Sequence, residues 1–162
     1  MKRLWAPWRL EYVLSPKEDE CIFCCKPKES NDKDRKNLIL YRGEHNFIIL
    51  NLYPYNNGHL MIVPYKHTDV LTTLAPEEMG EMGILTQKSI AVLEKLFTPQ
   101  GFNVGINIGT AAGAGIKEHV HMHVVPRWEG DTNFMAAIGD TRVMVQHINE
   151  TYDSLVEGFK KL

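Results

Sequence analysis

An alternating segment near position 120 constrains the fold of this 162-residue chain more than any other feature. The string HVHMHVV, at 119–125, places a histidine at every second position of its first five residues. Neighbouring residues of an extended strand point to opposite faces, so this period predicts a half-buried β-strand. His119, His121 and His123 then share one face. Three imidazoles that titrate near neutral pH contribute little as packing, so we expect that face to be a chemical site.

The whole chain, residues 1–162, is predicted to form a single α+β domain with an antiparallel sheet of about five strands and two main helices. Segments rich in β-branched and aromatic residues indicate the other strands, at 38–41, 47–52, 59–64 and 102–109. One helix is expected from Pro76 to about Pro99, and a C-terminal helix from about Thr141, at 141–162. Residues 15–37 are rich in charge, Pro, Ser and Asn, and predict a loop that carries the cysteines.

Composition and charge exclude several classes of protein. The formal net charge of -2 argues against broad nucleic-acid binding, which needs a strongly basic face. No window approaches the roughly 20 apolar residues of a membrane span, and no apolar stretch follows the basic N-terminus as in a secretory signal. The 3 cysteines are too few and too clustered for a disulfide framework. We therefore expect a cytoplasmic protein that binds neither nucleic acid nor membranes.

The histidine row by itself allows two kinds of chemistry. Three histidines form the ligand set of some catalytic zinc sites. Alternatively, a neutral imidazole is a nucleophile at pH 7 without a strong base to activate it, and it can attack phosphorus directly. The periodicity leaves both interpretations open.

The residues around the row resemble one family. HVHMHVVPR, at 119–127, is similar to the His-x-His-x-His-x-x motif of the histidine-triad (HIT) superfamily of nucleotide hydrolases and transferases. GHLMIVPYKH, at 58–67, and NIG, at 107–109, resemble that family's second and third signatures. Flanking strings are similar to those of its bacterial diadenosine tetraphosphate (Ap4A) phosphorylase branch, at 4–9, 51–56 and 126–134. The resemblance implies a HIT-like fold and a homodimer in which two sheets join into one.

The resemblance also implies unequal roles for the histidines. His121 would be the nucleophile that takes a nucleotidyl group from the α-phosphate, and His123 would hydrogen-bond the phosphate or the leaving-group oxygen. His119 would orient the site, through hydrogen bonding or as a metal ligand. Three other histidines are expected to be structural or surface residues: His45, His59 and His147.

Asn51, Leu52 and Asn107 are candidates for binding the substrate. Asn51 falls where many relatives hold an Asp that grips the ribose hydroxyls, and an Asn could bond them without the assistance of a charge. Leu52 could wall the base, although core packing explains it equally well. Asn107 stands where the family places an amide on the phosphate side, and an amide can both donate and accept.

Gly113, Ala114 and Gly115 form a loop that precedes the histidines. Its backbone N–H groups could approach a phosphate closely, because small residues leave the backbone accessible. Here the chain departs from the family, since many members carry Gln followed by Ser or Thr where this chain has Ala114 and Gly115. We therefore expect a roomier pocket with fewer side-chain contacts to phosphate.

Cys21 and Cys24 form a Cys-x-x-Cys pair, which is a common half of a zinc site. In zinc-binding relatives, the other two ligands are the histidine that closes the second signature and the first histidine of the triad. Those positions hold His67 and His119 here. The resemblance therefore implies a closed, structural zinc site that ties the N-terminal loop to the sheet. Cys25 would be a spare thiol.

The leading hypothesis for function is nucleotidyl transfer through His121, with a dinucleoside polyphosphate such as diadenosine tetraphosphate as substrate and inorganic phosphate as acceptor. The first alternative is a nucleotide hydrolase or nucleoside phosphoramidase in which water is the acceptor. A second is a nucleotide-binding interaction module with little catalysis. A third is a metal-centred enzyme with the three histidines as ligands. We expect no organic cofactor.

Overall fold

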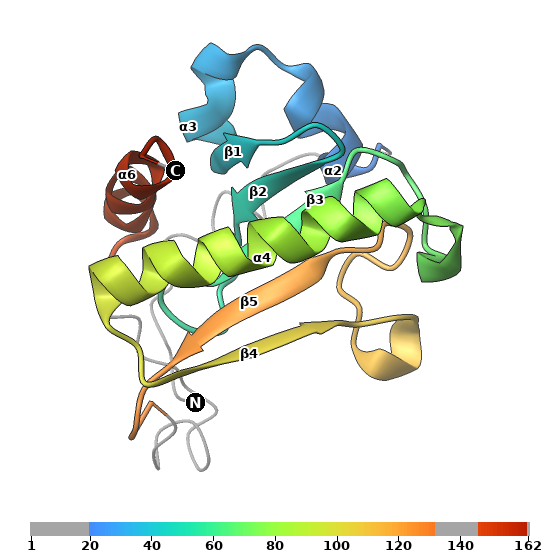
Figure 1. Ribbon diagram of the computed structural model, residues 1–162. Helices are drawn as coiled ribbons and strands as arrows, with labels where there is room; N and C mark the ends of the chain where they lie inside the picture. Colours follow the sequence, from blue (N-terminus) through green and yellow to red (C-terminus); the bar gives the residue numbers. More distant parts are fainter. Residues whose placement is uncertain (1–19, 132–145, 162) are drawn as a thin grey trace, which may run out of the picture.

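The computed structural model describes residues 20–131 and 146–161. Its centre is one antiparallel sheet in the spatial order β1-β2-β3-β5-β4 (Figure 1). The strands are β1 (Ile39–Arg42), β2 (Asn46–Leu50), β3 (Leu60–Pro64), β4 (Gly101–Ile106) and β5 (Met122–Arg127). The two long helices are α4 (Pro76–Phe97) and α6 (Ile148–Phe159). The predicted α+β fold, with an antiparallel sheet of five strands and two main helices, is confirmed.

Helix α4 lies across one face of the sheet (Figure 1). Pro76 occupies the first turn of the helix, where backbone N–H groups have no partner within the helix, so its lack of an N–H costs no hydrogen bond. The Glu78 carboxylate accepts a hydrogen bond from the Ala75 backbone N–H at 2.6 Å. Thr98 adopts a left-handed backbone conformation, with φ of 45°, and ends the helix. The buried residues of α4 repeat at helical spacing: Met82, Leu85, Ser89, Val92 and Leu93.

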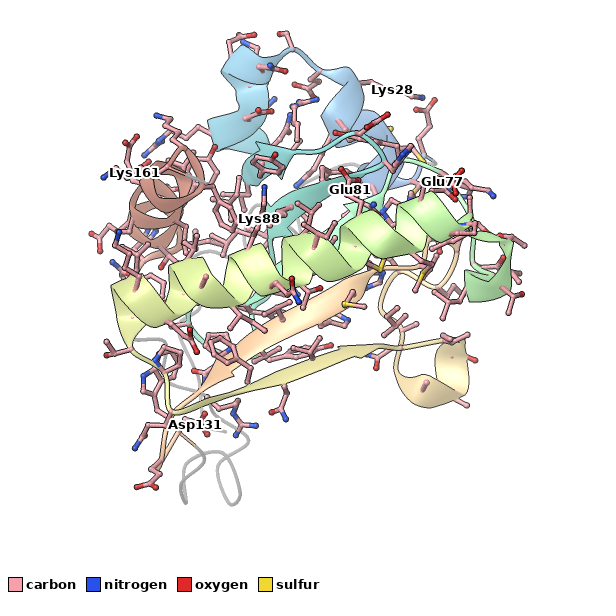
Figure 2. The ribbon with its side chains drawn as sticks, in the orientation of Figure 1. Lys28, Glu77, Glu81, Lys88, Asp131 and Lys161 are labelled. Atoms are coloured by element: carbon pink, nitrogen blue, oxygen red, sulfur yellow. The ribbon has the colours of Figure 1, made fainter. Side chains whose placement is uncertain are left out.

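Glu81 on α4 fixes the turn between β1 and β2 (Figure 2). Its carboxylate accepts hydrogen bonds of 2.7–2.8 Å from the backbone N–H groups of Glu44, His45 and Asn46. Burial by itself would raise the pKa of Glu81, but the hydrogen bonds from the Asn46 side chain and these amides lower it. A Cβ at Gly43 would lie 2.7 Å from the Asn46 backbone oxygen, so the turn requires glycine there.

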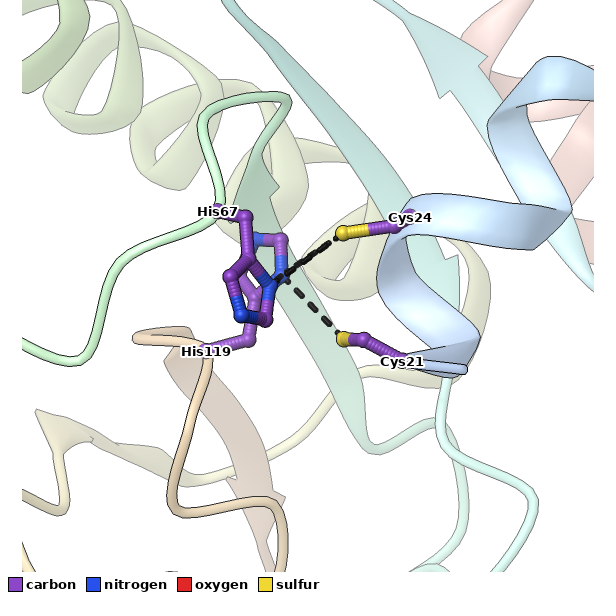
Figure 3. Close-up of side chains that lie close together, drawn as sticks. All are labelled: Cys21, Cys24, His67 and His119. Atoms are coloured by element: carbon purple, nitrogen blue, oxygen red, sulfur yellow. Dashed lines mark hydrogen bonds between the residues drawn. The ribbon is translucent and has the colours of Figure 1, made fainter. Parts of the chain in front are cut away.

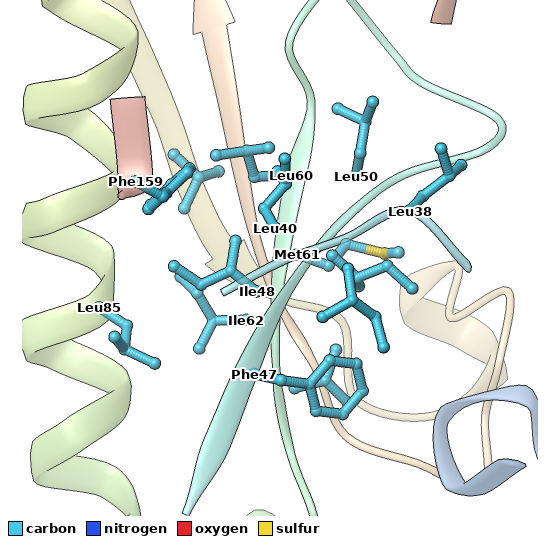
Figure 4. Close-up of a cluster of buried hydrophobic side chains, with 14 of the residues drawn as sticks. Leu38, Leu40, Phe47, Ile48, Leu50, Leu60, Met61, Ile62, Leu85 and Phe159 are labelled. Atoms are coloured by element: carbon cyan, nitrogen blue, oxygen red, sulfur yellow. The ribbon is translucent and has the colours of Figure 1, made fainter. Parts of the chain in front are cut away.

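The main core lies between the sheet and the two long helices (Figure 4). Ile48, Ile62, Leu85 and Phe159 meet there, and none is more than 3% exposed. Every residue of β2 and β3 is buried, because α4 covers one face of the strands and the segment around α2 (Ile22–Cys25) lies on the other. This second cover brings the cysteines to the histidine face.

The segment expected to be a loop at 15–37 contains short helices in its described part, so that expectation is wrong from residue 20 onward. The short helices are α2, η1 (Lys26–Lys28), η2 (Asn31–Lys33) and α3 (Asp34–Asn37). Pro27 lies within η1, and Leu38 takes a left-handed conformation, with φ of 63°, directly after α3. Each helix ends within about one turn, so no helical period develops in the sequence.

Two expected element starts are also wrong. Strand β5 begins at Met122 rather than at His119, because the Val120 N–H donates to the Thr68 carbonyl oxygen at 2.7 Å instead of joining the ladder. The C-terminal helix begins at Ile148, and residues 141–145 lie outside the described residues. The His147 ring accepts a hydrogen bond from the Asn149 N–H and acts as the N-cap, which fixes that start.

Two one-turn helices complete the described chain, η3 (Leu71–Thr73) before α4 and η4 (Thr110–Ala112) after β4. The strand expected at 102–109 therefore ends early, at Ile106, and its last residues lead into η4 through Gly109, whose φ is 78°. Within residues 20–131 and 146–161, no helix combines the length and the apolar character that crossing a bilayer requires.

Candidate active site and metal site

The alternation of histidines with apolar residues places them on different sides of β5. Met122 faces α4, where the Thr86 hydroxyl donates to its sulfur at 3.1 Å, whereas His123 pairs with Met61 of β3. A half-buried strand would leave the histidine face open to solvent, but this face is covered. His119, His121 and His123 are only 0%, 4% and 8% exposed, because the α2 segment and the start of β3 pack against them.

Burial decides the charge of these histidines. It lowers the pKa of His121, and burial together with the neighbouring His121 lowers the pKa of His123 to about 4. Both imidazoles are therefore neutral at pH 7. A neutral imidazole holds one proton and one lone pair, so its chemistry depends on which nitrogen carries the proton.

The position of the His121 proton is set by the backbone. Its Nδ1–H donates to the His119 carbonyl oxygen at 2.7 Å. A carbonyl can only accept, so the Nδ1 of His121 carries the proton and Nε2 keeps the lone pair. This arrangement suits an imidazole that attacks an electrophile through Nε2.

His123 has the opposite arrangement, and His59 is the cause. The Tyr55 backbone N–H donates to the His59 Nδ1 at 3.0 Å, so the His59 proton lies on Nε2. That Nε2–H donates to the His123 Nδ1 at 2.9 Å. The neutral His123 ring therefore carries its own proton on Nε2, where it can donate a hydrogen bond to a ligand oxygen.

His59 is a site residue that the sequence analysis missed. It is fully buried, and burial with the neighbouring His123 and His121 lowers its pKa to about 3. It precedes the first residue of β3 and belongs to the string GHLMIVPYKH, which is the one sequence signal that could have drawn attention to it. Its contact with His123 spans 64 residues of chain, so spacing could not predict it.

Four side chains from three segments converge next to this site: Cys21, Cys24, His67 and His119 (Figure 3). The His119 Nε2–H donates to the Pro64 carbonyl oxygen at 2.8 Å, which leaves the His119 Nδ1 lone pair facing the cysteines. This Nδ1 lies 3.4 Å from the Cys21 sulfur and 3.3 Å from the His67 Nδ1, and the Cys24 sulfur lies 3.3 Å from the His67 Nδ1. All four ligand atoms lie within 4.8 Å of one another.

This cluster fits a tetrahedral zinc ion. Neighbouring ligand atoms around zinc, at metal–ligand distances of about 2.0–2.3 Å, lie about 3.3–3.8 Å apart. Four of the distances between the ligand atoms, at 3.3–3.6 Å, fall in this range. Burial and the neighbouring Cys21 raise the pKa of the Cys24 thiol to about 11, so two thiolates would need a cation between them. The donor set, two sulfurs and two imidazole nitrogens, is that of a closed structural site.

The alternative of a metal centre built from the three histidines is not supported by this geometry. The Nδ1 atoms of His119, His121 and His123 engage the cysteine cluster, a backbone carbonyl and His59 respectively. Both ring nitrogens of His119 already have partners, Nε2 in the Pro64 carbonyl oxygen and Nδ1 in the cysteine cluster. Among the described residues, the Cys21, Cys24, His67 and His119 cluster is the group that could hold an ion.

The candidate nucleoside residues lie on the loop between β2 and β3. The Asn51 side-chain amide lies 3.3 Å from the His59 Nδ1, and its oxygen accepts from the Tyr53 N–H at 2.9 Å, so its orientation is fixed by the site. Leu52 is 41% exposed, outside the core. Tyr55, which the sequence analysis did not single out, places its ring 4.6 Å from that of His59 and 5.6 Å from that of His123.

The candidate phosphate residues lie after β4. Ile106 pairs with Met122, so Asn107 follows at the level of His121 and is partly buried there. The Gly113 N–H donates to the Thr110 carbonyl oxygen at 3.0 Å, and the Ala114 N–H to that of Gly109 at 3.4 Å. These two amides are therefore engaged within the loop in this conformation, and a phosphate would have to compete for them.

Comparisons with known proteins agree with this geometry. The model of the HIT domain family matches residues 32–130. An AP-4-A phosphorylase of Mycobacterium tuberculosis is 41% identical over 157 residues, which cover 93% of this chain and 80% of that protein. A bis(5'-nucleosyl)-tetraphosphatase (asymmetrical) of Schizosaccharomyces pombe is 32% identical over 93 residues, 57% of this chain and 50% of that protein. A crystal structure of a zinc-bound histidine triad family protein from Mycobacterium smegmatis matches with a TM-score of 0.68 and 27% identity, covering 88% of this chain and 94% of that one.

Proposed function

Because this chain belongs to the HIT domain family, we propose that it is a nucleotidyltransferase that cleaves dinucleoside polyphosphates, with diadenosine tetraphosphate as substrate and inorganic phosphate as acceptor. The observation that carries this proposal is the pair of opposite tautomers of His121 and His123, on either side of the first residue of β5. The Nε2 of His121 carries a lone pair, whereas the Nε2 of the neighbouring His123 carries a proton. The 41% identity with an AP-4-A phosphorylase over 93% of the chain favours this substrate.

The reaction proceeds in two displacements at phosphorus. In the first, the His121 Nε2 lone pair attacks the α-phosphorus, a P–N bond forms, and the P–O bond to the leaving ATP breaks. The His123 Nε2–H donates a hydrogen bond to the developing charge on oxygen. No proton transfer is required, because a leaving polyphosphate is a weak base near neutral pH. In the second, a phosphate oxygen attacks the same phosphorus, the P–N bond breaks, and ADP leaves with His121 restored.

The substrate residues are part of the proposal. Asn51 and Leu52 would contact the nucleoside, since the fixed amide and the exposed leucine follow β2 beside the histidines. Asn107 would bond the α-phosphate from the level of His121. The loop with Gly113, Ala114 and Gly115 would supply backbone N–H groups after a local rearrangement, which the left-handed Gly113, with φ of 82°, makes easier.

A structural zinc ion held by Cys21, Cys24, His67 and His119 is the proposed cofactor. The fit of the four donor atoms supports it. When bound, zinc would supply no reacting atom and would instead join α2, the end of β3 and the histidine segment. A thiol-based site of this kind is typical of reducing compartments, which supports the cytoplasm as the location.

We also propose that two copies of the chain pair through β4. Among the described residues, β4 is the last strand of the sheet, and residues 103–105 are exposed. The string GFNVGINIG, at 101–109, contains no charged residue and no Pro, which are the usual protection of an edge strand. Antiparallel pairing with β4 of a second copy would satisfy this edge and join the two sheets.

The acceptor is tested by product analysis. The protein is incubated with diadenosine tetraphosphate in the presence and absence of inorganic phosphate, and the nucleotides are resolved. The proposal predicts ATP and ADP, formed when phosphate is present. AMP with ATP at equal rates under both conditions would instead make the protein a hydrolase. Absence of any nucleotide turnover would leave a binding module and contradict the enzymatic proposal.

A further inference from the structure

Phe23 lies between two proposed metal ligands in the sequence and against the proposed nucleophile in space. It is one of the two residues between Cys21 and Cys24 and is fully buried. Its ring centroid lies 5.1 Å from that of His121 at an interplanar angle of 58°, and 5.4 Å from that of His119 at 81°. One side chain thus contacts both the ring that carries the lone pair and the ring that faces the cysteines.

The His121 ring needs more than its hydrogen bond to be oriented. The bond from Nδ1–H to the His119 carbonyl oxygen fixes one atom and the tautomer, but the ring can still tilt about that contact. Displacement at phosphorus requires the Nε2 lone pair to be roughly in line with the bond that breaks. The ring contacts with Phe23 and with His123, at 4.8 Å and 72°, restrict this tilt.

The position of Phe23 depends in turn on the cysteine turn. Helix α2 has four residues, which is too short for a helix to be stable by itself. Its anchors are the burial of Phe23 and the two thiols, which lie 3.3–3.4 Å from the imidazoles of His67 and His119. A metal ion bound by Cys21, Cys24, His67 and His119 would fix the position of the cysteine turn, and the turn would fix the position of the Phe23 ring.

We propose that Phe23 is a positioning residue, which fixes the plane of the His121 ring and thereby couples the metal-binding turn to the nucleophile. This inference rests on the proposed function of His121. An aliphatic side chain at position 23 would fill much of the same volume without presenting a flat ring face to the imidazole. The effect should therefore fall on the rate of the chemical step and spare substrate binding.

The test compares Phe23→Leu with Phe47→Leu in the full-length, zinc-loaded protein. Phe47 is an equally buried phenylalanine whose ring stacks on Tyr65 at 5.4 Å, so it controls for the loss of a core ring. In Phe23→Leu, kcat for diadenosine tetraphosphate with phosphate should fall about tenfold to a hundredfold, with KM within about twofold. In Phe47→Leu, kcat should stay within about twofold of wild type despite lower thermal stability. Phe23→Tyr keeps the ring and should retain kcat even where its buried hydroxyl lowers stability.

A spectroscopic arm makes the result independent of turnover. Long-range proton–nitrogen NMR of the histidines reports the His121 Nδ1–H, which should be shifted or broadened in Phe23→Leu and unchanged in Phe47→Leu, at equal zinc content by mass spectrometry. Equal kcat losses in both leucine variants, or an unperturbed His121 signal in Phe23→Leu, would overturn the inference. If wild type turns over no nucleotide, the proposed function fails, and the NMR comparison still decides whether Phe23 orients the ring.

Discussion

The Nδ1–H of His121 donates to a carbonyl, whereas the Nδ1 of His123 accepts from His59, so two neighbouring imidazoles present opposite chemistry at Nε2. His119 differs again, because its Nε2–H donates a hydrogen bond to the Pro64 carbonyl oxygen and its Nδ1 lone pair faces the cysteine cluster. The three residues have the same side chain and similar burial. Only their hydrogen-bond partners distinguish the proposed roles of nucleophile, hydrogen-bond donor and metal ligand.

The buried histidines should make the protein less stable as the pH falls below about 6.5, the ordinary histidine pKa. The folded-state pKa values of His59 and His123 are about 3 and about 4, chiefly because burial disfavours the charged ring. At pH values between these folded-state pKa values and about 6.5, the unfolded chain binds more protons than the folded one. The stability that these two histidines contribute is therefore complete above about pH 6.5 and is lost as the pH falls toward their folded-state pKa values. Each can contribute a slope of up to about 1.4 kcal/mol per pH unit.

Urea unfolding at several pH values between about 7.5 and about 5 measures this slope. In His59→Gln one titrating group is gone, so the free energy of unfolding should depend less steeply on pH. A slope equal to that of wild type would show that His59 is not held neutral by the fold.

The sequence could predict where the triad lies, and the family resemblance implied unequal roles for its members, but the tautomers that accompany those roles could not be predicted. The alternating period and the family motif identified His119, His121 and His123 because both are local patterns. Tautomers depend on partners that are distant in the chain, such as Pro64, which lies 55 residues from His119. His59 was missed for the same reason, and the engaged amides of Gly113 and Ala114 could not be read from composition.

Among the elements, the short helix α2 matters more to the site than either long helix. Helix α4 was predictable, since Pro76 and an apolar stripe at helical spacing mark it. Helix α2 has no such stripe, because four residues complete barely one turn. Its place is determined by Phe23 and by the cysteines that meet His67 and His119 across the fold.

Exchange of Cys24 for Ser should therefore remove the metal, whereas exchange of the adjacent Cys25 should not. The Cys24 sulfur lies 3.3 Å from the His67 Nδ1, while the Cys25 thiol donates to a carboxylate oxygen of Glu20 at 3.1 Å. Native mass spectrometry should find about one zinc per chain in wild type and Cys25→Ser, and none in Cys24→Ser. Thermal unfolding should show a lower midpoint for Cys24→Ser alone, because metal binding contributes folding free energy.

If Cys24→Ser binds zinc as wild type does, the four-residue site is wrong. Loss of zinc in Cys25→Ser with retention in Cys24→Ser would instead assign the ligand to Cys25.

For the whole molecule, the two edges of the sheet differ in protection. The outer strand β1 carries Arg42, which is paired with Asp34 of α3, and α6 packs beside it through the Tyr152 hydroxyl, which donates to the Ile39 carbonyl oxygen. The opposite edge, β4, has exposed residues and no charge. Pairing with a second copy would cover the exposed β4 edge. That β4 is an edge strand follows from the order of the strands in the sheet, which no local sequence pattern determines.

Val104→Lys should weaken self-association, since it places a charge on β4 where Val104 is 44% exposed. Sedimentation velocity at several concentrations should show a dimer for wild type and a shift toward monomer for this variant. Val70→Lys is the control, because Val70 is similarly exposed, at 46%, on the segment before α4. A monomeric wild type, or equal dissociation of both variants, would contradict pairing through β4.

The proposed mechanism requires that the lone pair at the His121 Nε2 forms a covalent bond to the nucleotidyl phosphorus. The direct measurement is a rapid chemical quench of the protein with diadenosine tetraphosphate in the absence of phosphate, followed by peptide mass spectrometry under conditions that preserve P–N bonds. We expect an adenylyl group on His121 in the wild type. In His121→Gln we expect no adduct and a turnover reduced by about a thousandfold or more. An adduct on His123, or turnover in His121→Gln close to that of wild type, would contradict the proposed mechanism.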